Sequence, residues 1–150
     1  MIWIKKHRGL VIFLALILVF LGWRWQRSQF DPEQQTKRYF YHHMAELEED
    51  IARWQTEGRL SFQPTPGLMV NVWDSEHDIV EYIVVSRGNV PSSTYYGFFY
   101  SPDKVPVSFQ NSGEALIQRD QYEWDWRGEG DNHGYVELMQ PYWYYFEASL

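Results

Sequence analysis

The sequence predicts an α+β protein: an N-terminal transmembrane helix, then one amphipathic helix packed on an antiparallel β-meander of about five to seven strands. Three observations lead to this class. Residues 9–23 form an apolar run without a charge, residues 31–57 repeat apolar side chains three and four positions apart, and short strand-like segments separated by turns follow from residue 68. Aromatic residues make up 19% of the 150-residue chain, which supplies enough apolar surface for a folded core.

The apolar run is GLVIFLALILVFLGW, from Gly9 to Trp23. As a helix it would span roughly 22 Å, short of a hydrocarbon core of about 30 Å, but Trp3 and Trp25 extend it with side chains suited to the membrane interface. No small-residue cleavage site follows, which disfavours a signal peptide, and the run has no polar face, which disfavours a core helix. We expect an uncleaved signal-anchor helix over residues 9–25, embedded in the lipid bilayer.

Charge is divided unevenly along the chain. Residues 1–38 hold seven Lys and Arg against two Asp and Glu, whereas residues 39–150 hold six against eighteen, a net charge of −12. The positive-inside rule then predicts a cytoplasmic basic tail at residues 1–8 and one extracytoplasmic domain at residues 26–150. Such an acidic domain would repel phosphates, so nucleic acid is excluded as a partner. The lack of Cys excludes disulfides and thiol nucleophiles.

Residues 31–57 are predicted to form the amphipathic helix. Asp31 is a suitable N-cap, Pro32 suits the first helical position, and Gly58 is a natural terminator. The apolar stripe consists of Phe40, Met44, Leu47, Ile51 and Trp54. Because this stripe covers only about two heptads, we expect it to pack on the protein's own sheet rather than in a coiled coil.

Beyond Gly58 the apolar period changes to two, which is typical of strands. The predicted strands are residues 68–73, 79–86, 94–100, 105–110, 122–127, 135–139 and 142–148. Pro106 limits the fourth of these to a sheet edge, because proline cannot donate a ladder hydrogen bond. Residues 128–134 are predicted to form a hairpin tip.

Consecutive aromatic residues in the last third must occupy both faces of the sheet, since side chains alternate along a strand. One face would pack on the helix, and the other requires a second cover or a ligand. Exposed Trp and Tyr suit sugar stacking, peptide contact or a protein partner. The candidate binding residues are Tyr95, Tyr96, Trp124, Trp126, Tyr142 and Trp143. The alternative is a core that loops and the C-terminal strand enclose completely.

The hairpin tip and the strand before it carry three carboxylates among glycines, namely Asp125, Glu129 and Asp131. Oxygen ligands on a flexible loop suit calcium, although the spacing differs from that of an EF-hand and a simple turn explains the composition equally well. The same carboxylates, beside Trp124 and Trp126, could perform acid–base hydrolysis of an envelope polysaccharide. No nucleophile, phosphate-loop or zinc motif occurs, so no cofactor is expected.

Two segments carry a resemblance: TYYGFFYSPDKVPVSFQ (Thr94–Gln110) and DNHGYVELMQPYWYYFEASL (Asp131–Leu150). Both resemble the C-terminal parts of small, uncharacterised, membrane-anchored bacterial proteins. The resemblance covers roughly the last third of the chain and implies a protein of the bacterial cytoplasmic membrane, with no assigned activity. We therefore expect a single-pass, extracytoplasmic binding or accessory protein of the cell envelope, whose partner is another envelope protein or polymer. An anchored hydrolase and a calcium-dependent structural domain are the alternatives.

Overall fold

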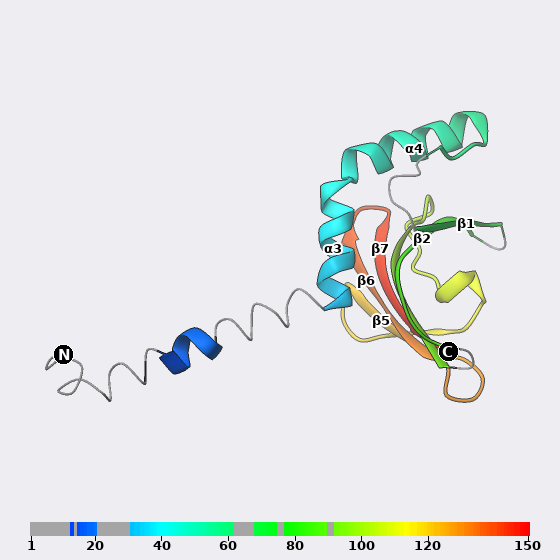
Figure 1. Cartoon of the computed structure of the whole chain (residues 1–150). Helices are drawn as coiled ribbons and strands as arrows, with labels where there is room; N and C mark the ends of the chain where they lie inside the picture. The colour runs from blue at the N-terminus through cyan, green and yellow to red at the C-terminus, as the bar shows by residue number, and fades with distance from the viewer. Residues whose placement is uncertain (1–12, 14, 21–30, 62–67, 75–76, 90–91) are drawn as a thin grey trace, which may run out of the picture. The chain divides into compact units, whose positions relative to one another are not determined.

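A computed structural model describes residues 13, 15–20, 31–61, 68–74, 77–89 and 92–150 (Figure 1). The chain divides into two units, residues 1–35 and 36–150, which are described separately.

In the first unit, the predicted membrane helix over residues 9–25 lies mostly outside the described residues. Residues 13 and 15–20 are described, and they are helical with exposed apolar side chains such as those of Phe13 and Val19. Within the described parts of the chain, no helix is both long enough and apolar enough to cross a membrane. Further along this unit, Asp31 caps a helix as predicted, because its Oδ1 accepts a hydrogen bond from the Glu33 N–H at 3.2 Å.

The amphipathic segment forms two helices, α3 (Pro32–His42) and α4 (Met44–Glu57), so the prediction of one continuous helix is wrong. His43 lies between them with φ −108° and ψ 15°, and α4 leaves in a different direction from α3 (Figure 1). The break lets the apolar stripes of both helices reach one curved sheet face. Gly58 ends α4 as predicted: its φ is 68°, and its N–H donates to the Trp54 carbonyl oxygen at 2.8 Å.

The predicted antiparallel sheet is confirmed and has seven strands in the order β1-β2-β3-β7-β6-β5-β4. The strands are β1 (Met69–Asp74), β2 (Asp78–Asn89), β3 (Ser92–Tyr100), β4 (Leu116–Gln118), β5 (Glu123–Arg127), β6 (His133–Gln140) and β7 (Trp143–Ser149). The C-terminal strand β7 pairs with both β3 and β6. It therefore joins two antiparallel runs of three strands, so the chain is not one simple meander.

The segment between β3 and β4 differs most from the prediction. Residues 105–110 do not form an edge strand: they cross one face of the sheet and enter a 3₁₀ turn, η1 (Phe109–Asn111). Gln110 and Asn111 have positive φ values of 56° and 51°. The short strand β4 forms one edge of the sheet, opposite the edge at β1, and it was not predicted from the sequence. We call residues 101–115 the covering loop, because its Val107 and Phe109 are buried against the sheet.

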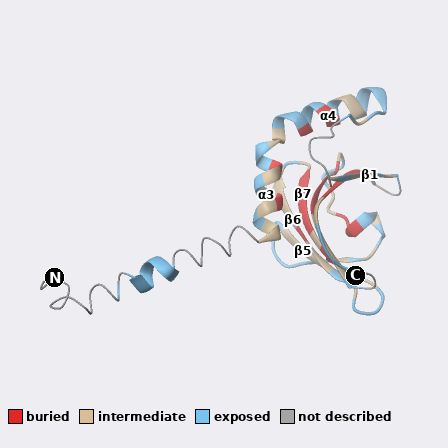
Figure 2. Ribbon diagram, viewed as in Figure 1, coloured by how far each residue is buried: buried red, intermediate tan, exposed pale blue. Residues whose placement is uncertain are grey.

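The two faces of the sheet carry two separate cores. The helix-side core, beneath α3 and α4, consists of Phe40, Leu47, Ile51, Val80, Tyr82, Phe98 and Trp143. The loop-side core consists of Ile79, Ile83, Phe99, Val107, Phe109, Trp126, Val136, Tyr144, Phe146 and Ala148. Buried residues run along the central strands and form short patches on both helices (Figure 2). The aromatic runs are thus divided between two covered faces.

Two glycines permit close packing of aromatic rings on the strands. A Cβ at Gly97 would lie 2.6 Å from the Phe146 ring and would also collide with the Tyr82 carbonyl oxygen. A Cβ at Gly134 would collide with the indole of Trp126. Both positions therefore require glycine for lack of space, since neither has a positive φ.

Candidate functional site

An open pocket of about 710 Å³ lies between the covering loop and the strands β4 and β5. This volume falls within the roughly 300–1,000 Å³ typical of small-molecule sites. The lining residues are His77, Val105, Pro106, Val107, Ser108, Asn111, Ser112, Gly113, Glu114, Leu116, Gln118 and Trp124. The lining combines an indole, aliphatic side chains and several hydrogen-bonding groups, so the pocket suits a ligand with both apolar and polar parts.

Glu114 is a carboxylate held in place by two serines of the covering loop. Ser108 Oγ donates to Glu114 Oε2 at 3.0 Å, and Ser112 Oγ hydrogen-bonds to the same oxygen. Partial burial raises the pKa of Glu114, but hydrogen bonds from Ser112, from its own backbone N–H and from Ser108 outweigh that effect and leave the pKa below its ordinary value. Glu114 therefore places a fixed negative charge in the pocket at neutral pH.

His77, just before β2, also lines the pocket. Its Nδ1 lies 3.1 Å from Asp103 Oδ2, and its carbonyl oxygen accepts a hydrogen bond from Asn111 Nδ2 at 2.6 Å. The covering loop therefore contacts His77 through two different residues, Asp103 and Asn111. Because its Nδ1 contacts the Asp103 carboxylate, the His77 ring is oriented by Asp103 and not by Ser108 or Ser112.

Trp124 supplies the aromatic wall from β5. It lies directly opposite Gln118 in the β4–β5 register, and its ring meets that of Tyr144 edge-on, with centroids 6.1 Å apart. The indole is half-buried. It therefore presents a supported ring surface to the pocket.

Glu81 fixes the covering loop from below. This carboxyl is 1% exposed, and its Oε1 accepts hydrogen bonds from Asn71 Nδ2 and Trp73 Nε1, each at 3.3 Å. Its Oε2 accepts from the Gln110 N–H at 3.1 Å. Burial raises the pKa of Glu81, and these hydrogen bonds offset the rise only in part. One buried carboxyl thus ties β1, β2 and the loop that lines the pocket.

Three of the predicted binding residues are tryptophans, and the structure separates them. Trp126 is buried in the loop-side core and Trp143 in the helix-side core, so these two lie on opposite faces of the sheet. Trp124 lines the pocket. Alternation along β5 explains why Trp124 and Trp126 share a face, but only Trp124 borders the pocket.

The three predicted tyrosines are half-buried and lie apart from the pocket lining. Tyr95 stacks on Phe109 with centroids 5.3 Å apart. Tyr142 stacks on Tyr100, and the Lys104 ammonium lies 4.7 Å from its ring centroid. Tyr96 is on the opposite face of β3 from Tyr95. The structure therefore does not bring the six predicted residues onto one binding surface.

The predicted calcium ligands are not gathered into a site either. Among the residues that the structure describes, no group of three or more His, Asp or Glu side chains could hold a metal ion. Asp125 Oδ2 pairs with Arg119 Nε at 2.5 Å, on the face of β5 away from the pocket. Glu129 and Asp131 are exposed at the hairpin tip. None of these carboxylates lines the pocket beside Glu114.

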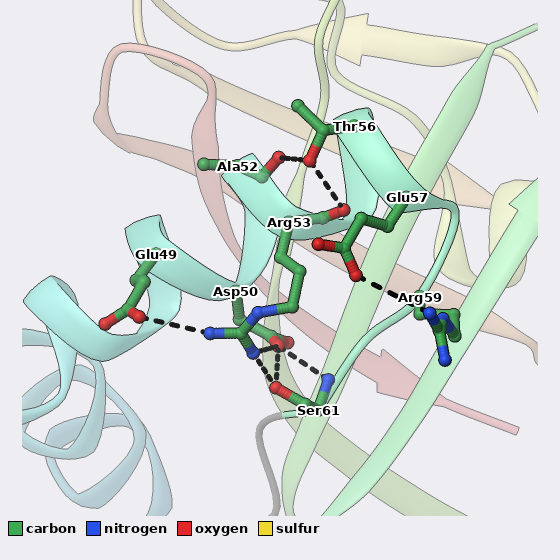
Figure 3. Close-up of polar contacts among 8 residues, drawn as sticks. All are labelled: Glu49, Asp50, Ala52, Arg53, Thr56, Glu57, Arg59 and Ser61. Carbon is green, nitrogen blue, oxygen red and sulfur yellow. Dashed lines mark hydrogen bonds and ion pairs between the residues drawn. The ribbon is translucent and has the colours of Figure 1, made fainter.

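A second polar cluster lies at the end of α4 (Figure 3). Asp50 Oδ1 accepts hydrogen bonds from the Ser61 N–H at 2.6 Å and from the Ser61 hydroxyl at 3.1 Å. Arg53 lies 3.5 Å from Asp50 Oδ1 and 3.1 Å from Glu49, and it hydrogen-bonds to Ser61. The contacts of Asp50 and Arg53 with Ser61 fasten the segment after α4 to the helix.

Most of the residues that form the pocket could not be predicted from the sequence. The sequence predicts a weak strand through Ser108, a turn at Ser112 and a surface position for His77, and it predicts no role for Glu114. The recognisable signal was the turn sequence Asn111-Ser112-Gly113, which marks a reversal but not its position over a sheet face. Comparison with protein-family models, with curated proteins and with solved structures finds no match to this chain. The resemblance of the last third therefore stays a prediction.

Proposed function

We propose that the chain is a single-pass, membrane-anchored binding protein of the bacterial cell envelope, with its α+β domain outside the cytoplasm. The open pocket beside the covering loop is the observation that carries the binding role. It combines the Trp124 indole, the Glu114 carboxylate and several hydroxyl and amide groups in about 710 Å³. An envelope polymer offers both the ring surfaces and the hydroxyl groups that such a lining complements.

Binding is favoured over hydrolysis by the state of the reactive groups. Both serines in the pocket hydrogen-bond to Glu114, and the His77 ring faces Asp103. Acid–base hydrolysis of a glycoside requires two carboxyl groups about 5–10 Å apart across the scissile bond. Among the described lining residues, Glu114 is the carboxylate, and no second one accompanies it.

The anchor is supported by the sequence and by exposed side chains. Residues 9–23 contain no charge, and the described part of this run exposes Phe13, Leu16, Leu18 and Val19. Exposed large apolar side chains in a row suit a lipid surrounding. The basic residues before the run and the net charge of −12 after residue 38 favour an extracytoplasmic domain.

Two measurements test the anchor and its orientation. The full chain should stay with membranes during alkaline carbonate extraction, because an embedded helix is not released by loss of surface charge contacts. A reporter that is active only outside the cytoplasm, joined after Leu150 through a flexible linker, should be active. Release of the protein by carbonate would contradict the anchor, and a stable but inactive fusion would reverse the orientation.

A sedimentation experiment tests the pocket. The full-length protein, kept in a detergent without a sugar headgroup, should co-sediment with insoluble envelope polysaccharide freed of protein. Trp124→Ala should reduce the retained fraction several-fold, because it removes the ring surface of the pocket. Tyr122→Ala is the matched control: Tyr122 is 50% exposed nearby on the chain but does not line the pocket. Equal retention of wild type and Trp124→Ala would exclude the pocket as the binding site.

A further inference from the structure

We propose that the pocket selects a carbohydrate carrying free, protonated amino groups, with an ammonium group at Glu114 and a sugar ring against Trp124. This inference rests on the proposed function, because it names the ligand class of the same pocket.

Charge complementarity excludes an anionic ligand and favours a cationic one. Among the described residues that line the pocket, Glu114 supplies a negative charge and none is Lys or Arg. Asp103 adds a second carboxylate behind His77, and residues 39–150 carry a net charge of −12. A carboxylate or phosphate would be repelled, whereas an ammonium would form a charge-assisted hydrogen bond with Glu114.

The Glu114 carboxylate is already oriented before any ligand arrives. Ser108 is 3% exposed, and it holds Glu114 Oε2 from the buried side of the loop at 3.0 Å. Ser112 contacts the same oxygen from the exposed side. A preoriented acceptor loses little conformational entropy on binding, so less of the favourable interaction with the donor is offset and the affinity is higher.

The rest of the lining favours a sugar over a simple amine. Trp124 is braced by Tyr144 and presents a ring on which the C–H face of a sugar can stack. Gln118 is exposed and can both donate and accept hydrogen bonds, and the exposed Ser112 hydroxyl, whose proton is directed at Glu114, can still accept one; both groups therefore match sugar hydroxyls. A linear, fully protonated polyamine has no hydrogen-bond acceptor for the amide N–H groups of Gln118, and it has no ring that could stack on the Trp124 indole.

Calorimetric titration of two trimers tests the selection. The probes are a β-1,4-linked glucosamine trimer and the same trimer with every amine acetylated, added to full-length protein in a detergent without a sugar headgroup. We expect the amino trimer to bind at least about tenfold more tightly, the range of one charge-assisted hydrogen bond. Raising the salt concentration should lower the affinity for the amino trimer more than the affinity for the acetylated trimer, because salt screens the charge interaction.

Variants assign the effect to the two residues. Glu114→Gln removes the charge but keeps an oxygen that can accept from Ser108, so it should abolish the tenfold preference and leave both trimers at the weaker affinity. Glu129→Gln removes an exposed acid outside the pocket and should keep the preference. Trp124→Ala should lower the affinity for both trimers, whereas the control Tyr122→Ala should change neither affinity.

Three results would overturn the inference: equal affinity of the wild type for the two trimers, a preference that survives in Glu114→Gln, or spermidine binding as tightly as the amino trimer. None of these affects the retention of the protein on envelope polysaccharide. The proposed function fails separately, if Trp124→Ala is retained as well as wild type. The experiments can therefore contradict the selection of amino groups without contradicting the proposed binding function, and the reverse.

Discussion

The two faces of the sheet are covered in different ways. On one face, α3 and α4 bury an aromatic cluster in which Phe40 meets Phe98 and Trp143 edge-on, with centroids 5.1 and 5.3 Å apart. On the other, the covering loop buries Val107 and Phe109 but has little regular structure of its own. A helix satisfies its own backbone hydrogen bonds, whereas a loop needs partners from elsewhere.

Side chains provide those partners on the loop side. Glu81 accepts from the Gln110 N–H, the Tyr144 hydroxyl donates to the Lys104 carbonyl oxygen at 2.7 Å, and the Ser101 hydroxyl accepts from the Val105 N–H at 3.2 Å. The loop-covered face therefore carries buried hydrogen-bonding groups, and residues of the loop itself line the pocket. The comparison shows that the pocket lies on the face covered by a loop and not on the face covered by helices, in keeping with the common occurrence of binding sites on loops.

The largest expected effect compares one phenylalanine from each face. Phe98→Ala should lower the free energy of unfolding by about 4–5 kcal/mol, because its fully buried ring packs among other rings in the helix-side core. Phe109→Ala should cost nearer about 3 kcal/mol, because the loop can relax into the cavity. Urea unfolding of the full-length protein in micelles measures both. A larger loss for Phe109→Ala would break the comparison.

An intermediate effect is expected at Gly97, whose added Cβ would collide with the Phe146 ring on the loop side and with the Tyr82 carbonyl oxygen. Gly97→Ala should lower the free energy of unfolding by about 1–3 kcal/mol through overpacking. Gly128→Ala is the control, since the nearest atoms to its new Cβ would lie 3.3 Å away. Unfolding of both variants at the same urea concentration would contradict the close fit at Gly97.

The smallest effect is the pH dependence of stability that Glu81 contributes on the loop side. The pKa of Glu81 is raised in the folded protein, so the folded state binds this proton more tightly than the unfolded state. The Glu81 contribution is thus fully favourable below the ordinary carboxyl pKa and decreases as the pH rises through the folded pKa. Urea unfolding between pH 4 and pH 8 should show a shallower decline for Glu81→Gln than for wild type.

The exposed acid Glu129 provides the control for this pH series. Glu129→Gln removes a carboxylate without a buried environment and should leave the wild-type pH slope unchanged. If the free energy of unfolding falls equally with pH in Glu81→Gln and wild type, the buried Glu81 carboxyl does not titrate as predicted. The loop side would then not differ from the helix side through this carboxyl.

Much of the fold could be predicted because local patterns determine it. The period-two alternation placed β5 at 122–127, against Glu123–Arg127 observed, and correctly put Trp124 and Trp126 on one face with Glu123 and Asp125 on the other. Gly58 ended α4 through its own conformational freedom. In both cases the information lies within a few residues of the feature.

The break at His43 and the path of the covering loop could not be predicted, because long-range packing decides them. An unbroken stripe continues across His43, yet a curved sheet surface requires a change of direction there. Residues 105–110 alternate like a strand, but Val107 and Phe109 find their partners on a face that other segments build. The pocket depends on that path, so the roles of His77 and Glu114 could not be predicted either.

The position of β7 has a consequence for the order of assembly. Because the last strand pairs with β3 on one side and β6 on the other, the two three-stranded runs share no edge until residues 143–149 are in place. A nascent chain that stops before Trp143 would hold two open edges, at β3 and at β6, which are templates for pairing with other chains. Folding of the whole sheet therefore waits until residues 143–149 have been synthesised, and the closing step joins segments far apart in the chain, which is intrinsically slow.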